Sequence, residues 1–210
     1  MNSTVQDIDA IAAWVQQNVC SHFRLKKPND DYSVTGLVEL VEPTAYPCFL
    51  PALGDNTAPP VEAIAPCILV QLSGGSDDLV KHEATIKVRL CISTFSIGDQ
   101  SGSEIKPAEE SGDPFSRTFT VGKDGTLYGY TMNNDGWRDT WNIIDRVRRE
   151  LAGCESVAGL AVDRSTDVEY GFFTVDDAVW YAAPYWHSYI TFTLKRGAEP
   201  PQTAKMQEFL

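Results

Sequence analysis

The sequence predicts an α+β fold, a mainly antiparallel sheet of about four strands packed against two helices, with an additional β-hairpin excursion. Two segments carry apolar residues at the helical spacing of three or four, which gives each a continuous apolar stripe. Other segments alternate apolar and polar residues, as strands with one buried face do in antiparallel sheets. We expect a single domain over residues 1–196 and a C-terminal arm or disordered tail over residues 197–210, which contain a double proline.

Residues 4–20 are predicted to form the first helix, which Ser3 or Thr4 can cap. One apolar stripe faces the core and consists of Ile8, Ile11, Ala12, Val15 and Val19. A polar run ends this helix. Residues 33–41 then predict a short strand, and residues 43–66, rich in proline, alanine and glycine, predict a loop.

Two successive runs predict an antiparallel pair of strands. In CILVQL, the residues Ile68, Val70 and Leu72 share one face. In ATIKVRLCISTF, the apolar face consists of Ile86, Val88, Leu90 and Ile92. We expect the intervening SGGSDD, residues 73–78, to form the turn between the two strands.

A long excursion, residues 98–131, separates this pair from the second helix. Residues 98–114 are acidic and have no apolar periodicity, whereas RTFTV and TLYGYT around GKDG predict a hairpin. The excursion exceeds what a compact connection needs, and such excursions usually serve binding or oligomerisation. The hairpin residues that we expect at a subunit interface are Arg117, Phe119, Val121, Leu127, Tyr128 and Tyr130.

The segment DGWRDTWNIIDRVRRELAG predicts the second helix, with Asp135 as its N-cap and Gly153 at its end. Its apolar stripe consists of Trp137, Trp141, Ile144, Val147 and Leu151. The last turns are expected to hold Arg146, Arg148 and Arg149, where the helix dipole favours cations.

Two alternating strands around an aromatic, proline-containing link complete the domain. In the last strand Ile190, Phe192 and Leu194 alternate with polar residues. The aromatic residues at the link are Trp180, Tyr181, Tyr185, Trp186 and Tyr189. Core and turn packing explains this cluster as well as a protein interface does, and a sugar platform comes behind both because the sequence supplies no polar groups for it.

The composition limits the function classes. A formal net charge of -12 argues against gripping nucleic acid, because cations are needed to displace counterions from phosphate. An acidic surface would instead let a DNA duplex pass without sticking. No apolar run reaches the roughly 18 residues of a membrane helix, and the acidic N-terminal segment does not resemble a secretory signal, so we expect folding in the cytoplasm.

No pattern of reactive residues predicts a catalytic, cofactor-binding or metal site. The cysteines have irregular spacing and are expected to be buried, reduced thiols. Of His22, His82 and His187, none has metal-ligand spacing, and His187 is expected to be packed or at a rim. Ser73 lacks the surroundings of a nucleophile or a phosphate loop.

The order of elements resembles that of phage tail terminator or tail completion proteins, which are minor tail proteins at the head–tail junction. The resemblance rests on the strand Pro66–Leu72, the alternating IKVRLCISTF, the D-G-W-R-D helix opening at Asp135 and Pro-Tyr-Trp before the terminal strand. It covers residues 5–22, 64–97 and 132–196. It implies an α+β subunit of a ring, hexameric in this family, that stops polymerisation of the tail tube and offers the head-joining surface.

The resemblance also implies the partners and the place of the protein. These are further copies of the chain, the tail tube protein and a head–tail connector or neck protein, in the virion at the head-proximal end of the tail, after assembly in the host cytoplasm. DNA passes through without specific binding, and no membrane is involved. The acids that we expect to line the channel are Asp77, Asp78, Glu104, Glu109 and Glu110.

The sequence leaves other functions open. A neck adaptor or another tube-end protein of the same fold is an alternative within the same machinery. A small cytoplasmic enzyme or a ligand-binding module is an alternative of a different class. An enzyme requires a deep pocket with perturbed titratable groups, and a ligand-binding module requires the aromatic residues to surround a cavity.

Overall fold

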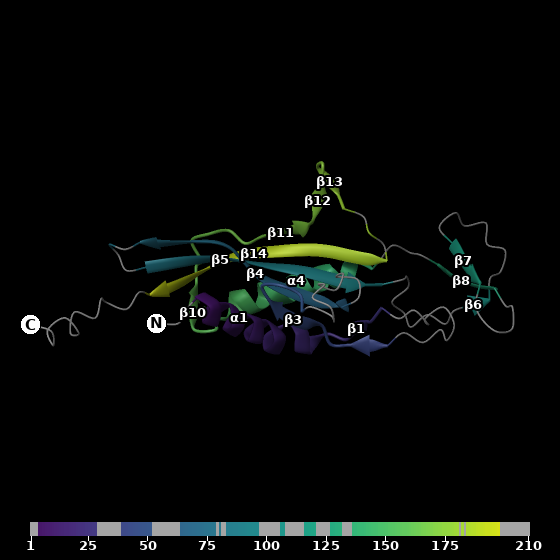
Figure 1. Ribbon diagram of the computed structural model, residues 1–210, viewed down its shortest axis with the longest axis horizontal. Helices are drawn as coiled ribbons and strands as arrows, with labels where there is room; N and C mark the ends of the chain where they lie inside the picture. Colours follow the sequence, from purple (N-terminus) through teal and green to yellow (C-terminus); the bar gives the residue numbers. More distant parts are fainter. Residues whose placement is uncertain are drawn as a thin grey trace, which may run out of the picture.

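The chain has the predicted α+β class. The computed structural model describes residues 4–28, 39–51, 64–78, 80, 83–96, 106–107, 116–120, 127–131, 136–180, 182 and 184–197, with the backbone alone for those between 106 and 131. Its two α-helices among these residues are α1 (Thr4–Asn18) and α4 (Trp137–Gly153). Both lie on the same side of a large sheet, below it in Figure 1.

The main sheet contains seven strands rather than about four. Its order is β3 (Thr44–Pro47), β4 (Cys67–Asp78), β5 (Glu83–Phe95), β14 (Tyr185–Gly197), β10 (Leu160–Val162) and β9 (Ser156–Val157), and β11 (Glu169–Phe172) also pairs with β14. All these pairs are antiparallel except the parallel pair β3–β4. The additional strands have two to four residues, which is too short for alternation to be recognised.

The predicted turn at residues 73–78 is wrong, because this segment continues β4. The ladder with β5 shifts its register between Leu72 and Gly74 and runs on until Asp78 lies opposite Glu83. Both faces of this part are exposed. A strand outside the core needs no apolar alternation, so its sequence is indistinguishable from that of a turn.

The core lies between the helices and the inner face of β4, β5 and β14. The predicted apolar faces of these strands are confirmed: Val70 lies opposite Leu90, and Phe192 lies opposite Val88, all buried. The predicted stripe of α1 is also buried. Its last member, Val19, lies one residue beyond the helix, before the 3-10 helix η1 (Cys20–His22).

Helix α4 ends at Gly153, as predicted, but differs from the prediction at its start and in its last turn. Gly136 occupies the N-cap position, and Asp135 lies outside the described residues. The fully buried face consists of Thr140, Ile143, Ile144 and Val147, with Leu151 nearly so. Trp137 and Trp141, predicted for the core, are only half-buried, because the start of the helix reaches the end of the sheet. No arginine lies in the last turn, since the helix continues to Gly153.

An ion pair joins the first helix to the last strand. Asp7 and Arg196 are 2.8 Å apart, and their side chains are 3% and 19% exposed. This pair ties α1 to the C-terminal end of β14, residues that are far apart in the sequence.

The predicted loop over residues 43–66 contains strand β3. Of the predicted strand 33–41, only residues 39–41 are described, and Leu40–Val41 form β2. Strand β2 pairs with β1 (Leu25–Lys26). The expected penultimate strand divides into β11 and a small hairpin of β12 (Thr174–Val175) and β13 (Ala178–Val179). The segment 198–210 lies outside the described residues.

The predicted hairpin of the excursion is confirmed, as β7 (Ser116–Thr120) paired with β8 (Leu127–Thr131). A third strand, β6 (Lys106–Pro107), lies in the acidic stretch 98–114, whose sequence has no apolar periodicity, and pairs with β8. These strands form a sheet separate from the main one. In Figure 1 this small sheet lies beyond the right-hand end of the main sheet. We call the segment between Ser96 and Gly136 the arm.

Candidate functional site

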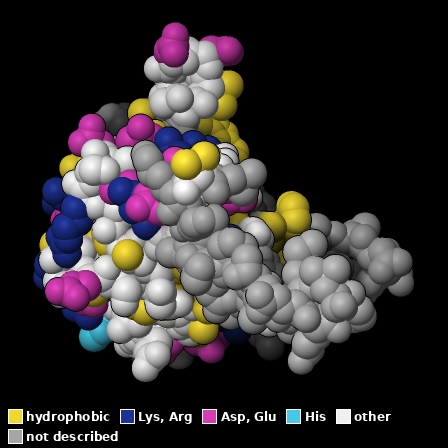
Figure 2. Space-filling model, turned by 90° about the vertical axis from the view of Figure 1, so that its left-hand side faces the viewer, with side chains coloured by type: hydrophobic (Ala, Val, Ile, Leu, Met, Phe, Trp, Pro, Cys, Tyr) yellow, Lys and Arg dark blue, Asp and Glu magenta, His cyan; other side chains and the backbone are white. Residues whose placement is uncertain are grey.

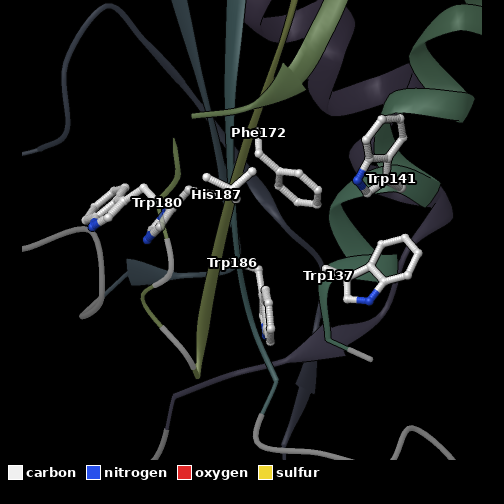
Figure 3. Close-up of a pocket in the computed structure, with 7 residues that line it drawn as sticks. Trp137, Trp141, Phe172, Trp180, Trp186 and His187 are labelled. Carbon is white, nitrogen blue, oxygen red and sulfur yellow. The ribbon is translucent and has the colours of Figure 1, made fainter. Parts of the chain in front are cut away.

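An aromatic pocket lies at the end of the main sheet where β14 begins. Its volume is about 290 Å³. The side chains that line it are Trp137, Trp141, Phe172, Val179, Trp180, Trp186 and His187. They come from α4, β11, the end of the β12–β13 hairpin and β14, so four segments separated in the sequence meet here (Figure 3).

The first two turns of α4 provide one wall. Trp137 and Trp141 are four residues apart and therefore lie on the same side of the helix, where both rings can face the pocket. The Trp141 ring contacts two rings of β11 edge-on, with centroid distances of 5.8 Å to Tyr170 and 5.6 Å to Phe172. These perpendicular contacts are the favoured geometry of aromatic pairs and hold the tryptophan in place.

The start of β14 provides the opposite wall. Trp186 and His187 are consecutive in a strand, so their side chains lie on opposite faces of the sheet. The Trp186 indole donates a hydrogen bond of 3.4 Å from Nε1 to the carbonyl oxygen of Ser96. The pocket therefore lies around the edge of β14. Strand β11 exposes this edge because its pairing with β14 ends where Phe172 lies opposite Ser188.

His187 is a packed residue, as expected. Its Nδ1 shares a hydrogen bond of 2.9 Å with the Ser93 hydroxyl, and its ring stacks on Trp180 at a centroid distance of 4.7 Å and an angle of 12°. The residue is 7% exposed. These two contacts fix the plane of the imidazole, which forms a wall of the pocket beside the indole.

The hairpin β12–β13 forms an outer rim. It projects from the sheet face opposite the helices (Figure 1) and is the knob at the top of Figure 2. Its turn contains Asp176 and Asp177 with φ angles of 50° and 62°, a conformation that usually selects asparagine or glycine. Two exposed valines, Val175 and Val179, flank the turn. The rim is thus apolar on its sides and acidic at its tip.

The expected aromatic cluster is divided between the pocket and its surroundings. Trp180 and Trp186 line the pocket, whereas Tyr185 packs against Phe95 at 5.2 Å and Tyr189 lies beneath Arg89 at 5.3 Å. Tyr181 lies outside the described residues. The cluster therefore serves both packing and a surface.

The pocket lining determines what it can hold. The described lining contains no Asp, Glu, Lys or Arg side chain, and it consists mainly of flat aromatic rings. Such walls bind another ring by offset stacking and edge contacts. The described lining thus fits an apolar or aromatic group.

The structure describes two of the five acids that were expected to line the channel. Asp77 and Asp78 are exposed at the end of β4, and Glu83, which the sequence did not single out, lies opposite Asp78 at the start of β5. The structure thus brings three carboxylates to one end of the sheet. Glu104, Glu109 and Glu110 lie outside the described residues.

The expected interface residues belong to the arm. Arg117 and Phe119 are in β7, opposite Tyr130 and Tyr128 of β8, and Leu127 lies opposite Thr120. Val121 lies outside the described residues, as do the side chains of the others. The structure therefore gives their backbone register alone.

The reactive residues lie away from the pocket, except for His187. His22 contacts Arg146 at 2.7 Å, and His82 lies outside the described residues. All five cysteines are free, and Cys20 and Cys67 are buried. Burial raises the pKa of the Cys20 and Cys67 thiols to about 12, so both remain protonated. Within the described part of the chain, no three His, Cys, Asp or Glu residues form a group that could hold a metal ion.

The sequence signal for the pocket was the pair of tryptophans at the start of an amphipathic helix. Their spacing also fits a core stripe, so it did not distinguish a wall from the core. Nothing in the sequence indicates that Phe172 and Val179 join them.

No helix in the described ranges is long and apolar enough to span a membrane. Comparison with models of protein families, with curated proteins and with solved structures finds no match to this chain.

Proposed function

We propose that the chain is a structural virion protein resembling phage tail terminators, which forms a ring, hexameric as in that family, at the head-proximal end of the tail tube. In this role the ring stops polymerisation of the tube and offers the surface that joins the head. Its partners are further copies of the chain, the tail tube protein and a head–tail connector or neck protein.

The observation that carries the proposal is the arm. Its strands β6, β7 and β8 pair with one another and form a sheet of their own, inserted between core strand β5 and core helix α4. Figure 1 shows this sheet beyond the end of the main one. A ring closes through two different patches on each subunit, and an element that extends from one subunit to the next supplies one of them.

The acidic end of the β4–β5 pair supports the same role. Asp77, Asp78 and Glu83 are exposed there, and the whole chain carries a net charge of -12. Carboxylates repel phosphate, so a channel lined by them lets DNA pass without holding it. We assign these residues to the lumen of the ring, together with Glu104, Glu109 and Glu110.

Deletion of the hairpin tests the role of the arm. A variant in which a short glycine-serine linker replaces Arg117–Thr131 is expected to be a monomer by multi-angle light scattering, because one of the two patches is removed. Circular dichroism checks that the α+β core remains folded. The matched control is D77N/D78N, which is expected to keep the ring because it alters the lumen alone. A hairpin-deleted protein of unchanged ring mass would sink the assignment.

The aromatic pocket favours a second function, that of a ligand-binding module. Its walls surround a cavity, which this alternative requires. The two functions are separated by mass spectrometry of the purified chain under native conditions. A stoichiometric bound small molecule on a monomer favours the ligand-binding module, whereas a multimer without one favours the ring.

A further inference from the structure

We propose that the aromatic pocket is the socket for the arm of a second copy of the chain, which fills it with an aromatic side chain. This inference rests on the proposed ring and deepens it, because it names the two patches that meet between neighbouring subunits. The occupant is thus a segment of this chain's own sequence.

Both ends of the arm are anchored at the pocket. Ser96, the last described residue before the arm, accepts the hydrogen bond from the Trp186 indole. Gly136, the first described residue after the arm, packs so closely on the same indole that a Cβ at this position would overlap its Nε1. The arm therefore leaves the core and re-enters it beside the same wall of the socket. Where two subunits meet at this end of the sheet, the arm of one lies near the socket of the other.

The socket fits one tethered ring better than a free ligand. Its volume of about 290 Å³ is at the lower limit for drug-sized molecules. Small-molecule sites also need a few polar groups to orient the ligand, and the described lining offers few: His187 is stacked on Trp180 and bonded to Ser93, the Trp186 indole is bonded to Ser96, and the Trp141 Nε1 is a buried donor without a described partner. A ring attached to a protein backbone is oriented by that backbone and needs no such group.

The surface around the socket exceeds what a small molecule covers. Apolar side chains that are more than a third exposed continue from the rim, namely Val168, Tyr170, Val175, Val179 and Trp180. All of them belong to one segment of the chain, 168–180. Exposed apolar groups that gather next to a pocket are typical of a protein interface, in which one buried aromatic anchor is surrounded by flatter contacts.

The arm has a complementary face. Paired residues and residues two apart share a face of a ladder, so the register places Arg117, Phe119, Tyr128 and Tyr130 on the same face of β7–β8. Three aromatic residues and one cation thus stand together. They are complementary in kind to a socket with aromatic walls whose rim has Asp176 and Asp177 at its tip, because rings bind rings and an arginine attracts carboxylates.

A second copy is the occupant because the arm and the socket are two different patches of one subunit. When the arm of each subunit binds the socket of the next subunit, identical contacts repeat around the assembly and can close a ring. In Figure 1 the arm sheet lies beyond the end of the main sheet, while the β12–β13 rim of the socket stands on the main sheet itself. The described strands of the arm thus lie outside the core, where we place the neighbouring subunit.

Two variants of the full chain test the proposal. V179K places a charge at the rim of the socket, at a residue that is 56% exposed and lies outside the core. Its matched control is V80K, since Val80 is 89% exposed and lies between β4 and β5, at the other end of the sheet. The arm variant is F119S/Y128S/Y130S. We expect V179K and the arm variant each to raise the concentration for half-assembly at least tenfold, and V80K to leave it unchanged.

Mixing the two deficient variants gives the decisive result. The mixture contains one intact arm and one intact socket, so it should form a heterodimer by native mass spectrometry at a concentration at which each variant alone is monomeric. If V179K forms rings at the same concentration as the parent chain, the pocket is not the socket, although the proposed ring stands. A mixture that stays monomeric would place the arm and the pocket in different contacts, and would overturn the proposal too. A parent chain that is itself monomeric, or whose pocket holds a small molecule, would contradict both.

Discussion

Gly136 shows how a single residue shapes the site. It occupies the N-cap of α4, and its backbone packs against the Trp186 indole. Its φ angle of -60° is open to any residue, so the requirement is for space and not for conformation. The absence of a side chain thus lets the start of the helix approach the start of β14 and closes one end of the aromatic pocket.

The change G136A should destabilise the protein by about 1–3 kcal/mol, because the added methyl group overlaps Trp186 and comes within 2.7 Å of the Ser96 Cβ. Urea unfolding measures the loss, and tryptophan emission reports the displaced indole. The control is G153A at the last residue of the same helix, where nothing lies within 4 Å of the added Cβ. It should be neutral or slightly stabilising. Equal effects of the two substitutions would contradict the packing argument.

Two thiols should be inert in the folded protein. Cys20 and Cys67 are buried, and burial raises the pKa of each to about 12, so the reactive thiolate is scarce at pH 8. Iodoacetamide is expected to label both only after unfolding in urea. Mass spectrometry of digested protein measures this, with the same reaction in urea as the control. Rapid labelling of either residue under native conditions would show that the core opens.

At the level of elements, three long strands and two helices build a core, and none of the described helices covers the other face of the sheet (Figure 1). The ion pair Asp7–Arg196 links the first turn of α1 to the end of β14 across this core. The acid also lies where the helix dipole favours a negative charge. The pair fixes one end of the helix, and the Gln16 side chain, which accepts a hydrogen bond from the Ala45 N–H and donates one to the Pro43 carbonyl, fixes the other.

The substitution D7A should cost about 3 kcal/mol, because it leaves the guanidinium of Arg196 largely buried and without its carboxylate. Replacing both partners, in D7L/R196M, should recover part of this loss since no charge remains buried. The control is E39A, which removes the pair Lys27–Glu39, whose side chains are 51% and 59% exposed. Its effect should stay within about 0.5 kcal/mol in urea unfolding. A D7A loss as small as that of E39A would show that the pair has no structural role.

For the whole molecule, sequence patterns predicted what depends on local periodicity. The faces of β5 and β14 and the stripe of α1 follow from residues a few positions apart, and the structure confirms them. Strands β3, β9 and β10 were missed because their partners, and not their own sequences, make them strands. The same reason explains the continuation of β4 through residues 73–78.

The candidate site was predictable only in part. The cluster around Trp180 and Trp186 was recognised from composition, but its division into wall and packing depends on where β11 leaves β14. The tryptophans of α4 were assigned to the core because helical spacing does not reveal how far a helix extends past the sheet. A site assembled from four segments is a property of tertiary structure, which periodicity in one segment does not encode.

The central claim is that this subunit forms a ring that terminates the tail tube. Electron microscopy of the purified chain, alone and mixed with its tail tube protein, tests it most directly. We expect hexameric rings that cap the tubes at one end, the end that meets the head. Monomers that persist at high concentration and leave the tubes uncapped would contradict the account.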